Sequence, residues 1–114
     1  LPKLEKMCWR DNKYLIRPLR NRAEFNKEGR NNHNCVASYY ETATEGRASI
    51  FVLRKIEAEE ESFVTVEIDL QKGELKQCYG KGNRLPEEGV KEWAEKWLAR
   101  MAKKKHKAAM KGAA

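Results

Sequence analysis

The chain has 114 residues, 40% of them hydrophobic and 36% charged, and its formal net charge is +7 at pH 7. This length suits one domain with its own core, and no apolar run approaches the roughly 18 residues of a membrane-spanning helix. Three widely spaced cysteines argue against a disulfide-stapled secreted protein, so we expect reduced thiols and a cytoplasmic location. Because the chain begins at Leu1 rather than Met, we expect it to be a domain of a longer protein.

The positive charge is unevenly spread along the chain. Basic residues outnumber acidic ones over 3–30, acidic residues gather at 57–61, and the segment 100–111 is basic with no acid in it. Such a distribution favours a polyanionic partner, nucleic acid first and an anionic membrane surface second. A solvated tail that only keeps the domain soluble is the alternative.

A short strand and a short helix are predicted for the first part of the chain. Residues 14–17 form the strand, and Pro18 ends it or confines it to a sheet edge, because proline cannot donate to a sheet ladder. Asn21 and Glu24 match a capping box, in which Asn21 accepts from the Glu24 amide and Glu24 reaches back. We expect this helix to stop at Gly29, since glycine readily adopts the left-handed C-cap conformation.

A second helix is predicted after the polar residues 32–34 and ends at Gly46. Its apolar side chains recur with a 3.6-residue period on one face: Cys35, Val36, Tyr39, Tyr40 and Ala43. On that face Cys35 is interpreted as a small buried hydrophobe. No second Cys or His pair joins His33 and Cys35 to complete a four-ligand set, so we predict neither a metal ion nor another cofactor.

Three antiparallel strands are predicted next. Residues 48–53 are apolar on both faces, as in a central strand, and the acidic residues 57–61 form a solvated loop. Residues 62–70 alternate strictly between apolar and polar, and a turn at 72–73 leads to a further strand at 75–79. Connections this short make the strands antiparallel neighbours.

The last helix is predicted from Pro86 to Met101. Pro86 suits the first turn, where Glu87 and Glu88 would lie beside the positive end of the helix dipole. The apolar side chains keep helical spacing without a gap: Val90, Trp93, Ala94, Trp97, Leu98 and Met101. The elements together predict an α+β fold with a three- to four-stranded antiparallel sheet packed against helices, in the order β-α-α-β-β-β-α. The domain would span 1–102, and 103–114 would be a basic, flexible tail, either a fraying helix end or disordered.

Polar residues on two neighbouring strands form one candidate site. Thr65 and Glu67 share the polar face of their strand, and Gln77 lies opposite Glu67 if the register follows the turn at 72–73. A carboxylate beside an amide can bind a base edge or a sugar hydroxyl, or act as a general base. The alternative is that this face is ordinary exposed surface.

The segment 80–84, Gly-Lys-Gly-Asn-Arg, is a second candidate. Its two glycines allow the backbone to approach a ligand closely, and Lys81 and Arg84 supply cations. The N-terminus of the last helix would add a positive dipole, so a phosphate would fit here. The segment is not a Walker motif, and a plain glycine-rich connection is the alternative.

Three motifs lie at fixed places in this pattern. Residues 34–39 are Asn-Cys-Val-Ala-Ser-Tyr, residues 65–68 are Thr-Val-Glu-Ile, and residues 77–83 are Gln-Cys-Tyr-Gly-Lys-Gly-Asn. With the strand that closes on Arg54, this combination resembles the PcfJ-like family. Tyr79 departs from the family pattern, in which a basic residue is expected.

The resemblance covers about 26–101 and implies the C-terminal domain of a protein from conjugative plasmids, integrative elements or phages. It implies a cytosolic protein with DNA-transfer neighbours, and it supplies no mechanism. The polar residues shared with the family are ligand-binding or structural: Arg54, Thr65, Glu67, Gln77 and Asn83.

Our leading hypothesis is a non-catalytic, nucleic-acid-associated domain of a mobile element that binds through its basic surface and the polar sheet face. The expected binding residues are Arg54, Thr65, Glu67, Gln77, Lys81, Asn83 and Arg84. One alternative is a small enzyme acting on a nucleotide or nucleic acid, with Glu67 as base and Arg54 or Lys81 holding phosphate. The other is an interaction module that docks on other proteins of the transfer machinery. A patch of Arg and Lys around the sheet face would favour the first hypothesis. A closed pocket around Glu67 would favour the second, and a flat apolar patch would favour the third.

Overall fold

A five-stranded antiparallel sheet forms the centre of the fold in the computed structural model, which describes residues 2–113. The strands pair in chain order: β1 (Trp9–Arg10), β2 (Tyr14–Pro18), β3 (Ser49–Lys55), β4 (Val64–Asp69) and β5 (Glu74–Tyr79). The predicted α+β class and antiparallel pairing are confirmed, but three to four strands is too few. The sequence did not reveal β1 because only two residues pair, Trp9 with Ile16 and Arg10 with Leu15, too few to show an alternation.

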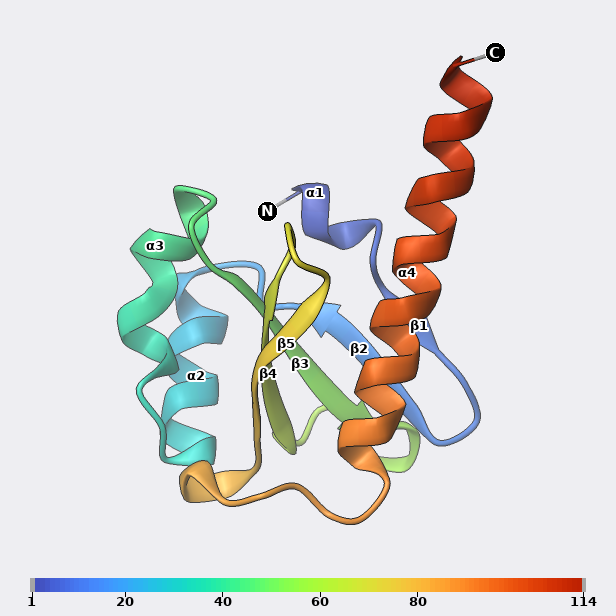
Figure 1. Ribbon diagram of the computed structural model, residues 1–114. Coiled ribbons are helices and arrows are strands. Elements are labelled where there is room, and N and C mark those ends of the chain that lie inside the picture. Colours follow the sequence, from blue (N-terminus) through green and yellow to red (C-terminus); the bar gives the residue numbers. More distant parts are fainter. Residues whose placement is uncertain (1, 114) are drawn as a thin grey trace.

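Helices cover both faces of this sheet, with α2 and α3 on one side and α4 on the other (Figure 1). Over the described residues the helical elements are α1 (Pro2–Glu5), α2 (Arg22–Asn32), η1 (Val36–Tyr39), α3 (Tyr40–Thr44), η2 (Ile56–Ala58), η3 (Lys81–Asn83) and α4 (Val90–Ala113), the η elements being short 3₁₀ helices. Apart from the single turn of α1, the order is therefore β-β-α-α-β-β-β-α, with one strand more at the start than predicted.

The sheet separates two apolar clusters, and β3 contributes to both. Phe51 and Leu53 belong to the cluster under α4, whereas Ile50 and Val52 belong to the cluster under α2, η1 and α3. This confirms the prediction that β3 is a central strand. The alternation predicted for β4 is confirmed as well, because its apolar residues lie on the α4 side: Val64, Val66 and Ile68. The polar residues of β4 consequently face the α2 side.

The predicted stop of α2 at Gly29 is wrong. The helix continues to Asn32, and His33 is its C-cap with a left-handed φ of 48°. Gly29 is needed for close packing instead: a Cβ there would lie 3.4 Å from both the Ala37 Cβ and the Asn34 carbonyl oxygen. The start of α2 follows the prediction in part, because the Glu24 amide donates to Asn21 Oδ1 over 2.9 Å.

The predicted helix after residue 34 is not uniform. It begins as the 3₁₀ helix η1 and becomes α-helical only at Tyr40. Asn34 starts it, because its Oδ1 accepts from the Val36 amide over 3.0 Å. Since a 3₁₀ helix has three residues per turn, the α-helical period does not hold there. Val36 is buried, but Cys35 is exposed, so the prediction of a buried Cys35 is wrong.

The last helix starts later and ends later than its apolar pattern suggests. It begins at Val90 rather than at Pro86, so Glu87 and Glu88 precede it. Its apolar face is buried as predicted, apart from the half-buried Trp93: Val90, Ala94, Trp97, Leu98 and Met101. Beyond Met101 the helix runs to Ala113 and projects past the sheet (Figure 1), and Ala114 lies outside the described residues. None of the helices within 2–113 is long and apolar enough to cross a membrane.

Trp97 and Trp93 offer a test of this packing. Trp97 is 2% exposed, contacts Phe51 edge-to-face at 5.0 Å between ring centroids, and donates from Nε1 to the Met7 carbonyl oxygen. Trp97→Ala should lower the free energy of unfolding by about 3–5 kcal/mol, because it leaves a cavity in the core. Trp93→Ala should cost less, since Trp93 is only half-buried. Urea unfolding measures both, and two variants as stable as the parent would contradict the assigned helix face.

Candidate functional site

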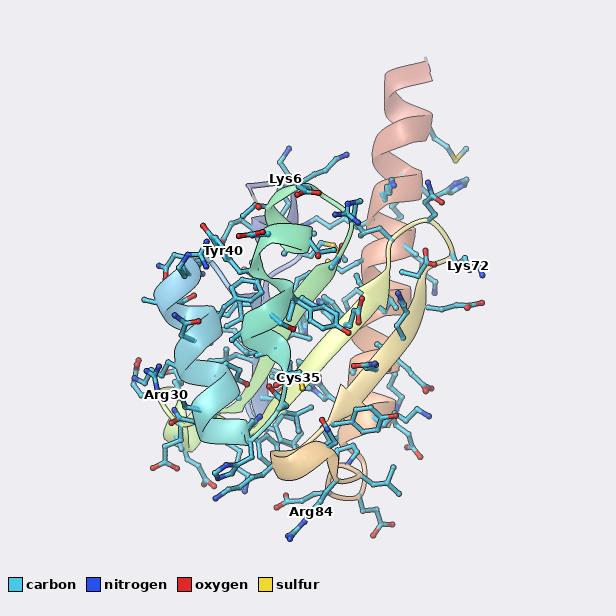
Figure 2. The ribbon with its side chains drawn as sticks, turned by 90° about the vertical axis from the view of Figure 1, so that its left-hand side faces the viewer. Lys6, Arg30, Cys35, Tyr40, Lys72 and Arg84 are labelled. Atoms are coloured by element: carbon cyan, nitrogen blue, oxygen red, sulfur yellow. The ribbon has the colours of Figure 1, made fainter. Side chains whose placement is uncertain are left out.

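A polar cleft lies where η1, β4, β5 and η3 meet. It has a volume of about 420 Å³ and is lined by Asn34, Cys35, Val36, Tyr39, Ile50, Thr65, Glu67, Gln77, Tyr79 and Asn83. The three sequence motifs at 34–39, 65–68 and 77–83 therefore converge on one place, although they are far apart in the chain. Figure 2 faces this side of the molecule, with Cys35 labelled in front of the sheet.

Strand register aligns the polar residues of the cleft. Glu67 pairs with Ile50 on one side and with Gln77 on the other, so the predicted pairing of Glu67 with Gln77 is confirmed. After this pair the register shifts, because Ile68 pairs with Leu75. Lys76 is thus an extra residue, or bulge, in β5. Its Nζ lies 3.4 Å from Glu67 Oε2, a contact that sequence alone gave no signal for.

Glu67 is buried, although its strand face could have been ordinary surface. The residue is only 6% exposed, and its ion-pair partner Lys76 has a side chain that is 56% exposed. Within residues 2–113 no hydrogen-bond donor is found for the Glu67 carboxylate, and its ion-pair partner is Lys76, whose Nζ lies 3.4 Å from Oε2. A buried carboxylate normally gathers several donors, so Glu67 retains acceptor capacity directed at the cleft.

A second buried carboxylate, Glu28 on α2, has the opposite environment. It accepts from Arg54 Nη2 at 3.0 Å, from Ser62 Oγ at 2.7 Å, from Thr65 Oγ1 at 2.9 Å and from Asn32 Nδ2 at 3.2 Å. Arg54 also donates to the Glu59 carbonyl oxygen at 2.9 Å. Arg54 is therefore engaged by Glu28 and does not pair with Glu67.

Thr65 joins this network to the cleft. While its hydroxyl donates to Glu28, its oxygen accepts from Asn34 Nδ2 over 3.2 Å. The same Asn34 holds the first turn of η1, so the 34–39 motif is anchored on the sheet through Thr65. Sequence reasoning missed Glu28, although Glu28 and Asn32 follow the buried Phe25 by three and seven residues and so share its helix face.

A family model described as PcfJ-like protein matches residues 1–93. The chain belongs to the PcfJ-like family. This confirms the resemblance drawn from the three motifs, and the match includes every residue of the cleft. It stops within α4, before the basic segment from Arg100 onwards. No curated protein and no solved structure matches the chain.

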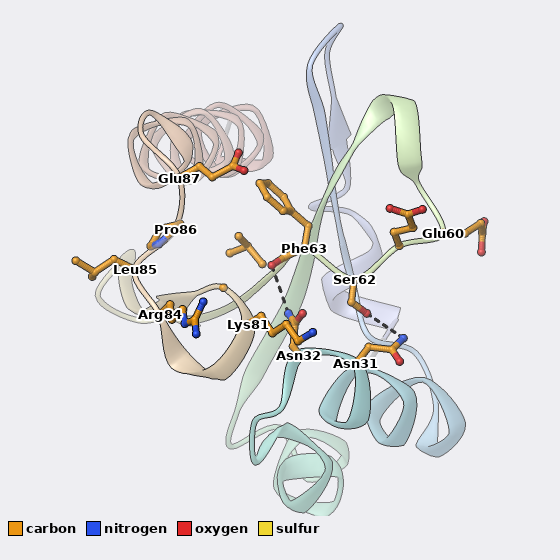
Figure 3. Close-up of a pocket in the computed structure, with 13 residues that line it drawn as sticks. Asn31, Asn32, Glu60, Ser62, Phe63, Lys81, Arg84, Leu85, Pro86 and Glu87 are labelled. Carbon is orange, nitrogen blue, oxygen red and sulfur yellow. Dashed lines mark hydrogen bonds between the residues drawn. The ribbon is translucent and has the colours of Figure 1, made fainter.

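The segment 80–84 of this PcfJ-like protein does not lie at the N-terminus of the last helix. It folds into η3, and α4 starts only at Val90, so the predicted contribution of the helix dipole is wrong. Lys81 and Arg84 line a separate hollow of about 620 Å³ next to Asn32 and Phe63 (Figure 3). The same hollow carries three carboxylates, Glu60, Glu61 and Glu87, so its charge is mixed.

The seven predicted binding residues are accordingly divided among three places. Thr65, Glu67, Gln77 and Asn83 line the cleft. Lys81 and Arg84 line the neighbouring hollow, and Arg54 is buried in the Glu28 network. Asn34, Tyr39 and Lys76 belong to the cleft or its rim and were not predicted.

The two buried carboxylates should respond differently to the same substitution. Glu28→Gln leaves Arg54 buried without its counter-charge and places an NH₂ group among donors, so we expect a loss of about 3–5 kcal/mol in the free energy of unfolding. Glu67→Gln should lower the free energy of unfolding much less, or raise it, because its charge serves no fold contact beyond the exposed Lys76. Thermal or urea unfolding compares them, and equal losses would contradict the distinction.

The three cysteines differ in exposure, so we expect them to differ in reactivity. Cys35 lines the cleft and is exposed, as is Cys8, whereas burial raises the pKa of Cys78 to about 11. Because the thiolate is the reactive form, Cys78 should resist alkylation in the native protein at pH 8, and Cys35 should be modified. Mass spectrometry of the labelled peptides measures this. Labelling of Cys78 as fast as Cys35 would show that β5 or α4 is misplaced.

Proposed function

We propose that this PcfJ-like chain is a non-catalytic, nucleic-acid-binding domain of a mobile genetic element, acting in the cytoplasm. The observation that carries the proposal is the projecting end of α4. Beyond Met101 all side chains from residue 102 to 107 are exposed, and four of them are lysines: Lys103, Lys104, Lys105 and Lys107. The family membership supports the association with a mobile element.

The projecting helix presents unneutralised charge. Successive residues of an α-helix are rotated by about 100°, so the three consecutive lysines span about 200° of its circumference. The sequence from Lys96 to the C-terminus contains no Asp or Glu, so carboxylates of the same helix cannot neutralise them. Arg100 stacks over the Trp9 ring at 4.2 Å and ties the start of this segment to the sheet. A row of phosphates suits such a surface, because lysines that neutralise phosphates release the cations condensed on the nucleic acid.

The alternatives have less support from the geometry. The cleft around the buried Glu67 agrees with the enzyme hypothesis. That hypothesis also needs Arg54 or Lys81 beside Glu67 to hold phosphate, but Arg54 pairs with Glu28 and Lys81 lines the other hollow. The docking hypothesis calls for a flat apolar patch on the surface. Among the described side chains, the large apolar ones that are exposed come from separate elements: Leu70, Leu85 and Met110.

The proposal predicts a salt dependence that belongs to α4. Changing Lys103, Lys104, Lys105 and Lys107 together to Gln should weaken binding to single-stranded oligonucleotides. It should also flatten the slope of log affinity against log salt by up to about 3, at about 0.7 for each lost phosphate contact. Fluorescence anisotropy from low to high salt measures both quantities.

A control variant separates this effect from net charge. Lys3, Lys13, Lys27 and Lys72 are exposed lysines on the body of the domain, and changing all four to Gln removes the same charge. We expect this variant to retain most of the slope. An affinity that ignores salt, or equal losses in the two variants, would overturn the proposed role of α4.

A further inference from the structure

The cleft around Glu67 has features that binding of phosphates to the lysines of α4 does not explain. Its floor holds the Glu67 carboxylate, which is more than nine-tenths buried and is paired with the exposed Lys76. A ligand that completes this carboxylate must present N–H or O–H donors, because an ionised carboxylate only accepts hydrogen bonds. An anionic group such as phosphate would be repelled from this position.

The other residues that line the cleft indicate the shape and polarity of its ligand. Tyr39 and Tyr79 supply aromatic rings, and the side-chain amides of Gln77 and Asn83 make no hydrogen bond within the described residues. Amides can both donate and accept, and aromatic rings stack on flat ligands. The volume of about 420 Å³ falls in the range of small-molecule sites. These properties fit a flat, uncharged, polar heterocycle.

We propose that the cleft binds one unpaired guanine base of a nucleic acid strand. Guanine presents two adjacent donors, N1–H and the N2 amino group, which match the two oxygens of the Glu67 carboxylate. The O6 and N7 acceptors of the base then face amide donors such as those of Gln77 and Asn83. Uracil and thymine place carbonyl oxygens on both sides of their only donor and would oppose the carboxylate. Stacking on tyrosine and pairing along the Watson–Crick edge is the usual way in which proteins read unpaired bases.

This inference rests on the proposed function, because the strand that supplies the base is the one collected by α4. The position of β5 makes the two sites compatible. It is an edge strand of the sheet, with α3 on one side and α4 on the other (Figure 1). A nucleic acid strand that crosses this sheet edge reaches Lys76 at the rim of the cleft. There one of its phosphates can lie beside Lys76 while the attached base points to Glu67.

The test compares an oligothymidine carrying one central guanine with the same oligomer carrying inosine or thymine at that position. Inosine keeps N1–H but lacks the N2 amino group. We expect the parent protein to prefer guanine over thymine by about 5- to 150-fold, the discrimination of one good bidentate pair, and to bind the inosine oligomer less tightly than the guanine one. Glu67→Gln should abolish this preference and leave the salt slope unchanged. Glu74→Gln removes the same charge from an exposed position of β5 and should keep the preference.

A second readout does not depend on α4. Guanosine should slow the alkylation of Cys35, which lines the cleft, and leave Cys8 unaffected; thymidine should protect neither. Equal binding of the three oligomers together with no protection by guanosine overturns the guanine site, even if the lysine variants confirm binding through α4. Protection by guanosine without oligonucleotide binding would instead support the cleft and overturn the role of α4.

Discussion

The buried carboxylate of Glu28 is the constraint on which the arrangement around the cleft depends. Removing an ionised carboxylate from water costs several kcal/mol unless donors replace the lost solvent. Four donors do so here, and they come from α2, β3, β4 and the segment before β4. Because these elements must hold their donors at hydrogen-bond distance, α2 has one position over the sheet. Thr65 also accepts a hydrogen bond from Asn34, which in turn holds the first turn of η1. The position of η1, and so of the wall of the cleft, therefore depends on the same network.

Glu28 and Glu67 lie on the same side of the sheet, and their contrast distinguishes a carboxylate that stabilises the fold from one that is available to a ligand. Both residues are buried. The acceptor capacity of Glu28 is met by side chains that are held in place by packing, whereas Glu67 has one flexible, exposed lysine. A fold gains little from a buried charge left in this state, and strain or unmet polarity of this kind is typical of binding sites. The bulge at Lys76 also points to a binding site here, because it interrupts the hydrogen-bond ladder of β5 next to the cleft and nowhere else along that strand.

The sequence was most informative where structure follows a local period. The alternation along β4, its pairing with β5 and the apolar face of α4 depend on neighbours within a few residues, so the pattern displays them. It was least informative where a distant contact decides. Gly29 looks like a helix end, but the helix continues to Asn32, and the glycine instead allows the close approach of Ala37. Arg54 looked like a phosphate ligand, but its partner Glu28 lies 26 residues away in the chain. The bulge at Lys76 has no signal in composition or spacing.

The proposed polyanionic partner must match the separation of charge across the molecule. The excess of positive charge projects with α4 beyond the sheet, whereas the cleft on the other side of β5 has a buried negative charge at its floor. An acidic protein surface would satisfy the helix and be repelled by Glu67. An anionic membrane would neutralise the lysines of the helix and leave the cleft unused. A single nucleic acid strand carries its negative charge on the backbone and its neutral donors on the bases, at a distance of one sugar. It is the polyanion whose own charge pattern matches both surfaces, which favours an unpaired strand over a duplex, where the donors of the Watson–Crick edge are already engaged.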